Sequence, residues 1–262
     1  MKYRLLGPLW VDGMEGIASP MAEKVPHKVQ VLLAALLVRS DQVVSAEQII
    51  GEIWGERPPR RATAALHVYI SQLRKLLATA HGADHLIVTR TPGYLMQLHG
   101  EMTDLESFRR LLRKGRAYMV AGSHQEASEC FEGALNLWRG PVLSGLRDGP
   151  IVNGFAAWVE ELRLECIELL IEAYFMLGRH RELVSYLQSV VSEHALHETF
   201  YRQLMLALYR CNRRAEALEI YQRARKILKS ELGLEPCRAL HDMHSAILAS
   251  DNRLEAGQPV GF

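Results

Sequence analysis

The chain has 262 residues, of which 48% are hydrophobic and 23% charged, a composition typical of globular domains that leaves room for two of them. Its formal net charge is only +1, so charge alone does not identify a nucleic-acid partner, although residues 1–100 hold 11 Lys and Arg against 8 Asp and Glu. Gly7, Pro8 and Asp12 interrupt any signal-peptide core, and no apolar run reaches the roughly 18 residues that a membrane-spanning helix needs. We therefore expect a cytoplasmic protein with no membrane segment.

Two helices are predicted near the amino terminus. Residues Pro26–Leu37 carry a proline at an early position and a broad apolar stripe, which indicates the first helix. Residues Asp41–Val44 are expected to be a link. Ser45 and Gln48 then form a capping box, in which the Ser45 hydroxyl accepts from the Gln48 amide while the Gln48 side chain reaches back. This box predicts a second helix from Ala46 to about Trp54.

A third helix is predicted from Ala62 to Leu77. The apolar residues that recur at the spacing of one helical face are Leu66, Ile70, Leu73 and Leu77. The opposite face is small and polar, which would let the helix backbone approach base edges in a DNA major groove. The residues that we expect to contact bases are Arg61, Ala64, Val68, Ser71 and Gln72. Gln72 can bond adenine bidentately, and Ala64 or Val68 can meet a thymine methyl group. An ordinary solvated surface helix is the alternative that this pattern alone leaves open.

A hairpin is predicted after the third helix. Residues Val88–Leu98 contain two short strand patterns separated by Pro92-Gly93, which supplies a turn. Three helices followed by a hairpin are the order of a winged helix-turn-helix. Arg90 near the turn can enter a minor groove, or it can be an ordinary exposed turn residue. The residues that we expect at DNA phosphates or on the wing are Arg60, His67, Arg74, Lys75, Thr89, Arg90 and Thr91.

Residues 24–98 resemble the OmpR/PhoB-type winged helix. The resemblance is carried by Val43-Val44-Ser45 at the start of the second helix and by Thr89-Arg90-Thr91-Pro92-Gly93-Tyr94, which matches the wing signature of that family. It implies that Tyr3–Val11, which alternates weakly, supplies a small amino-terminal sheet. Because little chain precedes residue 24, we expect no phosphoacceptor receiver domain before it.

The chain beyond residue 100 is predicted to be helical. Thr103–Glu106 and Ser123–Glu126 are further capping boxes. Residues 173–183 and 207–217 align at an offset of 34, which is the period of a tetratricopeptide repeat, and pair Gly178 with Asn212. An earlier copy is expected around Gly122, followed by an insert whose Gly145–Gly154 stretch is more loop than helix. A partner-binding or dimerising surface is the favoured interpretation of these repeats, and a purely stabilising helical domain is the alternative.

Taken in order, the chain resembles the Streptomyces antibiotic regulatory protein family. The carrying motifs are the winged segment, the run Leu137-Trp138-Arg139-Gly140-Pro141, the 34-residue repeat and Glu231–Pro236. The predicted fold is mainly α, with a winged helix-turn-helix in residues 1–98, a tetratricopeptide-like bacterial transcriptional activation domain in 104–250, and a flexible tail in 251–262. The resemblance implies activation of antibiotic biosynthesis genes, binding to direct repeats in double-stranded DNA, contact with RNA polymerase holoenzyme, and a homodimer or side-by-side protomers on DNA.

Other classes of function find little support in the sequence. It shows no phosphate-binding glycine loop, nucleophile elbow or zinc helix motif, so we expect no enzyme, no cofactor and no metal site. Four separated cysteines are expected to be buried and inert, and His81 and His85 to be loop residues. Two alternatives to an activator remain: a repressor with the same DNA-binding domain, and a protein-interaction scaffold.

Overall fold

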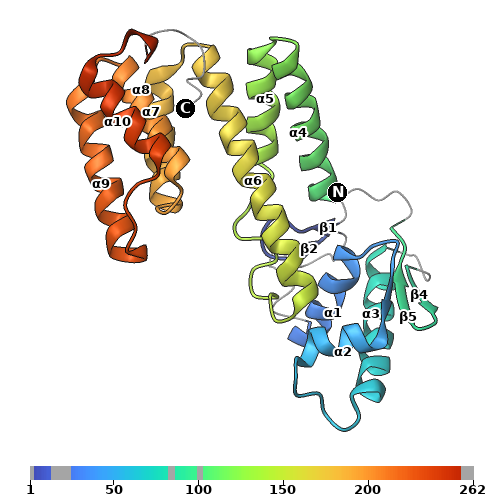
Figure 1. Ribbon diagram of the computed structural model, residues 1–262. Coiled ribbons are helices and arrows are strands. Elements are labelled where there is room, and N and C mark those ends of the chain that lie inside the picture. Colours follow the sequence, from blue (N-terminus) through green and yellow to red (C-terminus); the bar gives the residue numbers. More distant parts are fainter. Residues whose placement is uncertain (1–2, 13–24, 82–85, 99–102, 255–262) are drawn as a thin grey trace. The chain divides into compact units, whose positions relative to one another are not determined.

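The computed structural model describes residues 3–12, 25–81, 86–98 and 103–254 (Figure 1). Over these residues the chain is mainly helical, as expected, with ten α-helices and five short strands. It divides into two compact units, one made of Met1–Leu112 and Gly133–Glu165, the other of Arg113–Glu132 and Cys166–Phe262. None of the helices in the described ranges is long and apolar enough to cross a membrane.

The first unit contains the predicted winged helix. Its elements are β1 (Tyr3–Arg4), β2 (Trp10–Val11), α1 (His27–Val38), β3 (Val43–Ser45), α2 (Ala46–Trp54), α3 (Ala62–His81), β4 (Ile87–Arg90) and β5 (Gly93–Met96). Helices α4 (Asp104–Val120), α5 (His124–Leu135) and α6 (Pro150–Met176) contribute residues to both units. Strands β1 and β2 pair as an antiparallel ribbon, and β5 lies between β3 and β4 in a three-stranded antiparallel sheet.

At the start of α2 the sequence correctly predicts the helix cap but misses the strand that precedes it. The Ser45 hydroxyl accepts from the Gln48 amide at 3.1 Å, and the Gln48 side chain accepts from the Ser45 amide at 3.0 Å, so the capping box is confirmed. The preceding segment was expected to be only a link, but Val43–Ser45 is strand β3. Three residues are too few to show a period of two, and the pairing partner, β5, comes about 50 residues later in the chain.

A buried carboxylate joins α2 to the start of α6. Glu52 is fully buried, and its two oxygens accept the backbone amides of Ile151 at 2.7 Å and Val152 at 3.0 Å. These amides belong to the first turn of α6, where no intrahelical acceptor exists for them. Gly149 lies against the same carboxylate, because a Cβ there would come within 2.5 Å of Glu52 Oε2. The expectation of a loop through residue 154 is therefore wrong at its end, since α6 begins at Pro150.

A second buried carboxylate fixes the amino-terminal segment. Asp104, only 2% exposed, accepts the amides of Leu5 at 2.7 Å and Leu6 at 3.0 Å. Burial raises the pKa of the Asp104 carboxyl, whereas these amides and the nearby Arg139 guanidinium act to lower it. The Arg139 backbone amide in turn donates to the Leu6 carbonyl at 2.8 Å. Trp138 packs edge-on against Phe108, so the Leu137–Pro141 motif contributes to the core of the first unit.

The second unit contains the repeat. It includes α7 (His180–Glu193), α8 (Glu198–Arg210), α9 (Arg214–Leu232), α10 (Arg238–Ala249) and the 3₁₀ helix η2 (Asn252–Leu254). Gly122, Gly178 and Asn212 all have positive φ, at 76°, 71° and 59°, and each closes a helix. In each case the following amide bonds a carbonyl five residues earlier, as in a Schellman motif. The predicted equivalence of Gly178 and Asn212 is confirmed, and Gly122 has the same geometry.

Two smaller expectations need correction. Cys130 and Cys166 are buried as predicted, but Cys211 is only half-buried and Cys237, the N-cap residue of α10, is exposed. The tail was expected from residue 251, but η2 is helical and Leu254 is buried, its carbonyl accepting from Arg210 Nε at 2.9 Å. Residues 255–262 lie outside the described ranges.

We predict that Glu52→Ala lowers the free energy of unfolding by about 2–4 kcal/mol, because the part-buried amide of Ile151 and the buried amide of Val152 lose a charged acceptor. Urea unfolding followed by tryptophan fluorescence measures the change. Glu56→Ala is the matched control, because Glu56 is exposed just after α2, and it should change stability by no more than about 0.5 kcal/mol. Equal effects of the two substitutions would contradict the assigned role of Glu52.

Candidate nucleic-acid interface

The apolar face of helix α3 packs against α1 and α2. Leu66, Ile70 and Leu73 are at most 2% exposed, which confirms the apolar face predicted from their spacing. At the side of this face the Tyr69 ring stacks on Trp54 with their centroids 5.8 Å apart. The core of the winged helix therefore fixes how α3 is rotated about its own axis, and with it the identity of the residues that face outward.

The outward face of α3 carries the predicted base-contacting residues. Those that the structure places in exposed positions on the helix or in the turn before it are Arg61, Ala64, Val68, Ser71 and Gln72. Val68 is 53% exposed, which is unusual for a large apolar side chain and places a methyl-bearing surface toward solvent. The face as a whole offers small side chains, one amide and one guanidinium.

Thr63 is exposed at the edge of this face and was missed by sequence reasoning. It precedes His67 by four residues, so helical spacing alone would have found it. Arg60 is exposed in the turn before α3, and His67 and Lys75 are exposed on the helix. These side chains surround the small face with donors suited to phosphate oxygens.

The wing is a tight hairpin of β4 and β5. Its predicted tip residues Thr89, Arg90 and Thr91 are all exposed. Gly93 begins β5 opposite Ser45 of β3, and a Cβ at this position would lie 1.8 Å from the Val44 carbonyl oxygen. Only glycine permits this approach of the two strands, which explains why the wing signature has a glycine here.

Arg74 joins α3 to the wing. Its Nε donates to the Ile87 carbonyl at 3.0 Å, and its terminal nitrogen donates to the Thr89 hydroxyl at 2.9 Å. The side chain is partly buried, unlike the exposed Lys75 that follows it. The sequence suggested Arg74 only as a phosphate contact, whereas the structure shows that it positions β4. In Figure 1, α3 lies beside the β4–β5 hairpin, as these bonds require.

The arrangement brings most of the predicted residues onto one module. The helix face and the wing tip belong to elements bonded through Arg74 and packed on the same core. Within the described ranges, no group of three His, Cys, Asp or Glu side chains is placed to hold a metal ion. His81, expected in a loop, is instead the last residue of α3, and its side chain and His85 lie outside the described residues.

Two family models match the chain. The model described as "Transcriptional regulatory protein, C terminal" matches residues 24–96, which contain α1–α3 and the wing. The model described as "Bacterial transcriptional activator domain" matches residues 103–248, from the start of α4 into α10. Together the two matches cover most of the chain.

Individual proteins match over nearly the whole chain. It is 34% identical to the regulatory protein DnrI of Streptomyces peucetius, over 99% of this chain and 96% of that protein. It is 35% identical to the transcriptional regulator RedD of Streptomyces coelicolor, over 96% of this chain and 71% of that protein. A solved structure of Mycobacterium tuberculosis EmbR in complex with a low affinity phosphopeptide matches with a TM-score of 0.84 and 31% identity, over 99% of this chain and 66% of that one.

We predict that Gly93→Ala destabilises the first unit by about 1–3 kcal/mol or more, because the added methyl overlaps the backbone of β3. Thermal unfolding of the full chain measures this loss. Gly51→Ala is the control, and it should change the stability in the opposite direction. Gly51 is inside α2 with open space around it, so alanine should stabilise the helix by about 0.5–1 kcal/mol. Tolerance of alanine at residue 93 would show that β3 and β5 are not this close.

Proposed function

The chain belongs to the Streptomyces antibiotic regulatory protein family of transcriptional regulators, and we propose that it is a sequence-specific DNA-binding activator of secondary-metabolite biosynthesis genes. The observation that carries the proposal is the exposed, small-residue face of α3 beside a wing tipped by Arg90. A face of this kind can enter a major groove because short side chains let the backbone approach base edges.

In the proposed complex, α3 lies in the major groove. Ser71 and Gln72 bond base edges, Ala64 and Val68 meet thymine methyl groups, and Arg61 contacts a base at the amino-terminal end of the helix. Thr63 lies one turn before His67 and on the opposite side of the helix from Gln72, so it belongs with the flanking phosphate contacts and not with this set.

Phosphate contacts position the protein without specifying sequence. In the proposed complex the exposed side chains of Arg60, His67 and Lys75 contact the DNA backbone, and Thr89 and Thr91 flank the wing tip. Arg90 is placed to enter the adjacent minor groove. Arg74 acts indirectly, because its bonds to Ile87 and Thr89 connect the wing to α3.

Activation is assigned to the helical region matched by the bacterial transcriptional activator domain. We infer that protomers bind side by side on direct repeats and that this region contacts RNA polymerase holoenzyme. The support is the family of the chain and the relatives named as regulators, DnrI and RedD. A protein with this function acts in the cytoplasm, at the nucleoid.

Arg90→Ala should weaken binding to every duplex and reduce the slope of log K against log salt concentration by about 1, since one cation contact is lost. Fluorescence anisotropy over a range of salt concentrations measures the slope. Arg238→Ala removes the same charge from an exposed site in the second unit and should leave the slope unchanged. An unchanged slope for Arg90→Ala would remove the wing from the interface.

Gln72→Ala should relax the preference at one or two base positions, with a loss of discrimination of about 1–3 kcal/mol, while non-specific affinity stays similar. Selection from a random duplex library, repeated with the variant, measures the preference. A uniform loss of affinity across all sequences would show that α3 is oriented differently on DNA.

Transcription in a purified system tests the proposed activity as a whole. A promoter is given the selected binding site as a direct repeat, and RNA polymerase holoenzyme is added with and without the full chain. More transcript with the full chain is the expected result. Less transcript with intact DNA binding would identify a repressor, and absence of duplex binding would favour a protein-interaction scaffold.

A further inference from the structure

An apolar groove of about 510 Å³ lies in the first unit and is lined by residues of α1, α4 and α6 among others. The buried part of its lining includes four leucines, Leu5, Leu37, Leu98 and Leu105. Phe155 and Trp158 of α6 also line it, with their ring centroids 5.9 Å apart. Trp158 is 44% exposed, although tryptophan side chains are well buried on average. We call this site the Trp158 groove.

Arg109 of α4 places a cation beside the exposed tryptophan. Its guanidinium carbon lies 5.6 Å from the centroid of the Trp158 ring, and Arg39 at the end of α1 is a second exposed arginine of the lining. Glu106 is the one acidic residue among the described residues that line the groove, and its carboxylate accepts the Thr103 amide at 3.1 Å. The groove therefore joins an apolar interior to positive charge. Tryptophan and arginine are side chains that often dominate the binding energy of protein interfaces.

The positive charge continues along α4. Five of the eight residues 109–116 are Lys or Arg, and no acidic residue occurs between Glu106 and Glu126. Residues four apart lie on the same face of a helix, so Arg113 follows Arg109 on one line. The exposed cations of this segment, which we call the basic face of α4, are Arg109, Arg110, Arg113 and Lys114.

Like charges at this spacing destabilise a helix. Arginines at the starts of other helices form ion pairs with an acid three or four residues later, and these pairs are Arg179–Glu182, Arg213–Glu216 and Arg238–Asp242. Arg113 has no acidic residue three or four positions away in either direction along the chain. Carboxylates supplied from outside α4 would therefore relieve the repulsion on its basic face.

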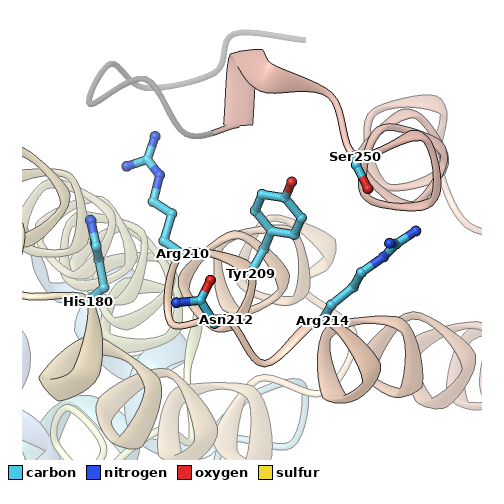
Figure 2. Close-up of a pocket in the computed structure, with 6 residues that line it drawn as sticks. All are labelled: His180, Tyr209, Arg210, Asn212, Arg214 and Ser250. Atoms are coloured by element: carbon cyan, nitrogen blue, oxygen red, sulfur yellow. The ribbon is translucent and has the colours of Figure 1, made fainter.

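Two cations of the second unit show a contrasting, internal role. Figure 2 shows Arg210 and Arg214 at a cavity of about 370 Å³ in that unit. The Arg210 Nε donates to the Leu254 carbonyl at 2.9 Å, and an Arg214 terminal nitrogen donates to the Leu248 carbonyl at 2.7 Å. These bonds hold η2 and the end of α10, so the cations there belong to the fold. Arg109 lies instead over an exposed aromatic ring.

We propose that the Trp158 groove and the basic face of α4 bind an acidic, amphipathic segment of a protein partner. Apolar side chains of that segment enter the groove, and its carboxylates pair with the arginines of α4. Residues 109–116 extend about 10 Å along the helix axis, which suits a length of polypeptide better than a small ligand. A nucleic-acid backbone would use the cations, but its phosphates gain nothing from the apolar interior of the groove. This role is separate from the DNA contacts proposed for α3 and the wing.

Fluorescence anisotropy of the full chain with two designed, labelled peptides tests the proposal. The first peptide has about 15 residues, with leucine and phenylalanine at helical spacing and glutamate at the other positions. The second keeps the same apolar residues and has lysine in place of every glutamate. We expect saturable binding of the glutamate peptide that weakens with added salt, and binding of the lysine peptide that is weaker by about tenfold or more.

Arg109→Gln should weaken binding of the glutamate peptide by about fivefold or more, because it removes the cation over Trp158. Arg181→Gln is the matched control, since Arg181 is an exposed arginine of the second unit, and it should change affinity by less than about twofold. Neither peptide contains tryptophan, so binding of the glutamate peptide should shift the tryptophan emission of the chain to the blue. Trp158→Phe keeps an aromatic ring in the groove and should abolish most of this shift.

Measurements on duplex DNA separate this site from the proposed DNA interface. Arg90→Ala should leave peptide binding unchanged, and Arg109→Gln should leave the salt slope of duplex binding unchanged. The proposal is overturned by absence of saturable binding of the glutamate peptide, by equal binding of the lysine peptide, or by equal losses in Arg181→Gln and Arg109→Gln. A flatter salt slope for duplex binding in Arg109→Gln would also overturn it, because the basic face of α4 would then contact DNA.

Discussion

The buried carboxylate of Glu52 is the contact on which the first unit depends. It lies on α2 of the winged helix, yet its oxygens accept the first amides of α6, 99 and 100 residues later in the chain. A buried charge is tolerated only when it is well hydrogen-bonded, so the position of α6 against α2 is tightly specified. Asp104 makes the corresponding contact between α4 and the amides of Leu5 and Leu6. Both carboxylates link the winged helix to residues of the region that follows it.

Because of these contacts, residues 1–100 cannot be separated from the rest of the chain without disturbing the first unit. Residues 133–165 belong to the same compact unit as α1–α3, so a fragment ending near residue 100 would leave Glu52 buried without its donor partners or expose it to water. Loss of activity in such a fragment would not separate DNA binding from activation. Substitutions in the full chain, at Arg90 or Gln72, distinguish the two roles because they leave the core of the unit intact.

Local signals in the sequence predicted much of this structure. The capping box at Ser45, the apolar face of α3 and the helix ends at Gly178 and Asn212 depend on residues within a few positions, and all are confirmed. The features that were missed depend on distant partners. Strand β3 exists because β5 pairs with it, and the start of α6 is set by Glu52.

The same contrast between features set by nearby residues and features set by distant partners applies to the candidate site. Exposure of the predicted residues on α3 could be derived from helical spacing, and Thr63 could have been found in the same way. The role of Arg74 could not, because an arginine on a helix edge has the same pattern whether it faces phosphate or donates to a neighbouring strand. Its bonds to Ile87 and Thr89 depend on where strand β4 lies relative to α3. The spacing of residues within α3 gives no information about that position.

We propose that the exposed face of α3 recognises DNA sequence in the cell. Crosslinked DNA recovered with the tagged full chain across the genome tests it most directly, with a Ser71→Ala and Gln72→Ala double variant alongside. We expect sharp sites that share a repeated motif upstream of a biosynthetic gene cluster, and loss of those sites in the double variant. Absence of enriched sites with the protein well expressed, or the same sites in the double variant, would contradict it.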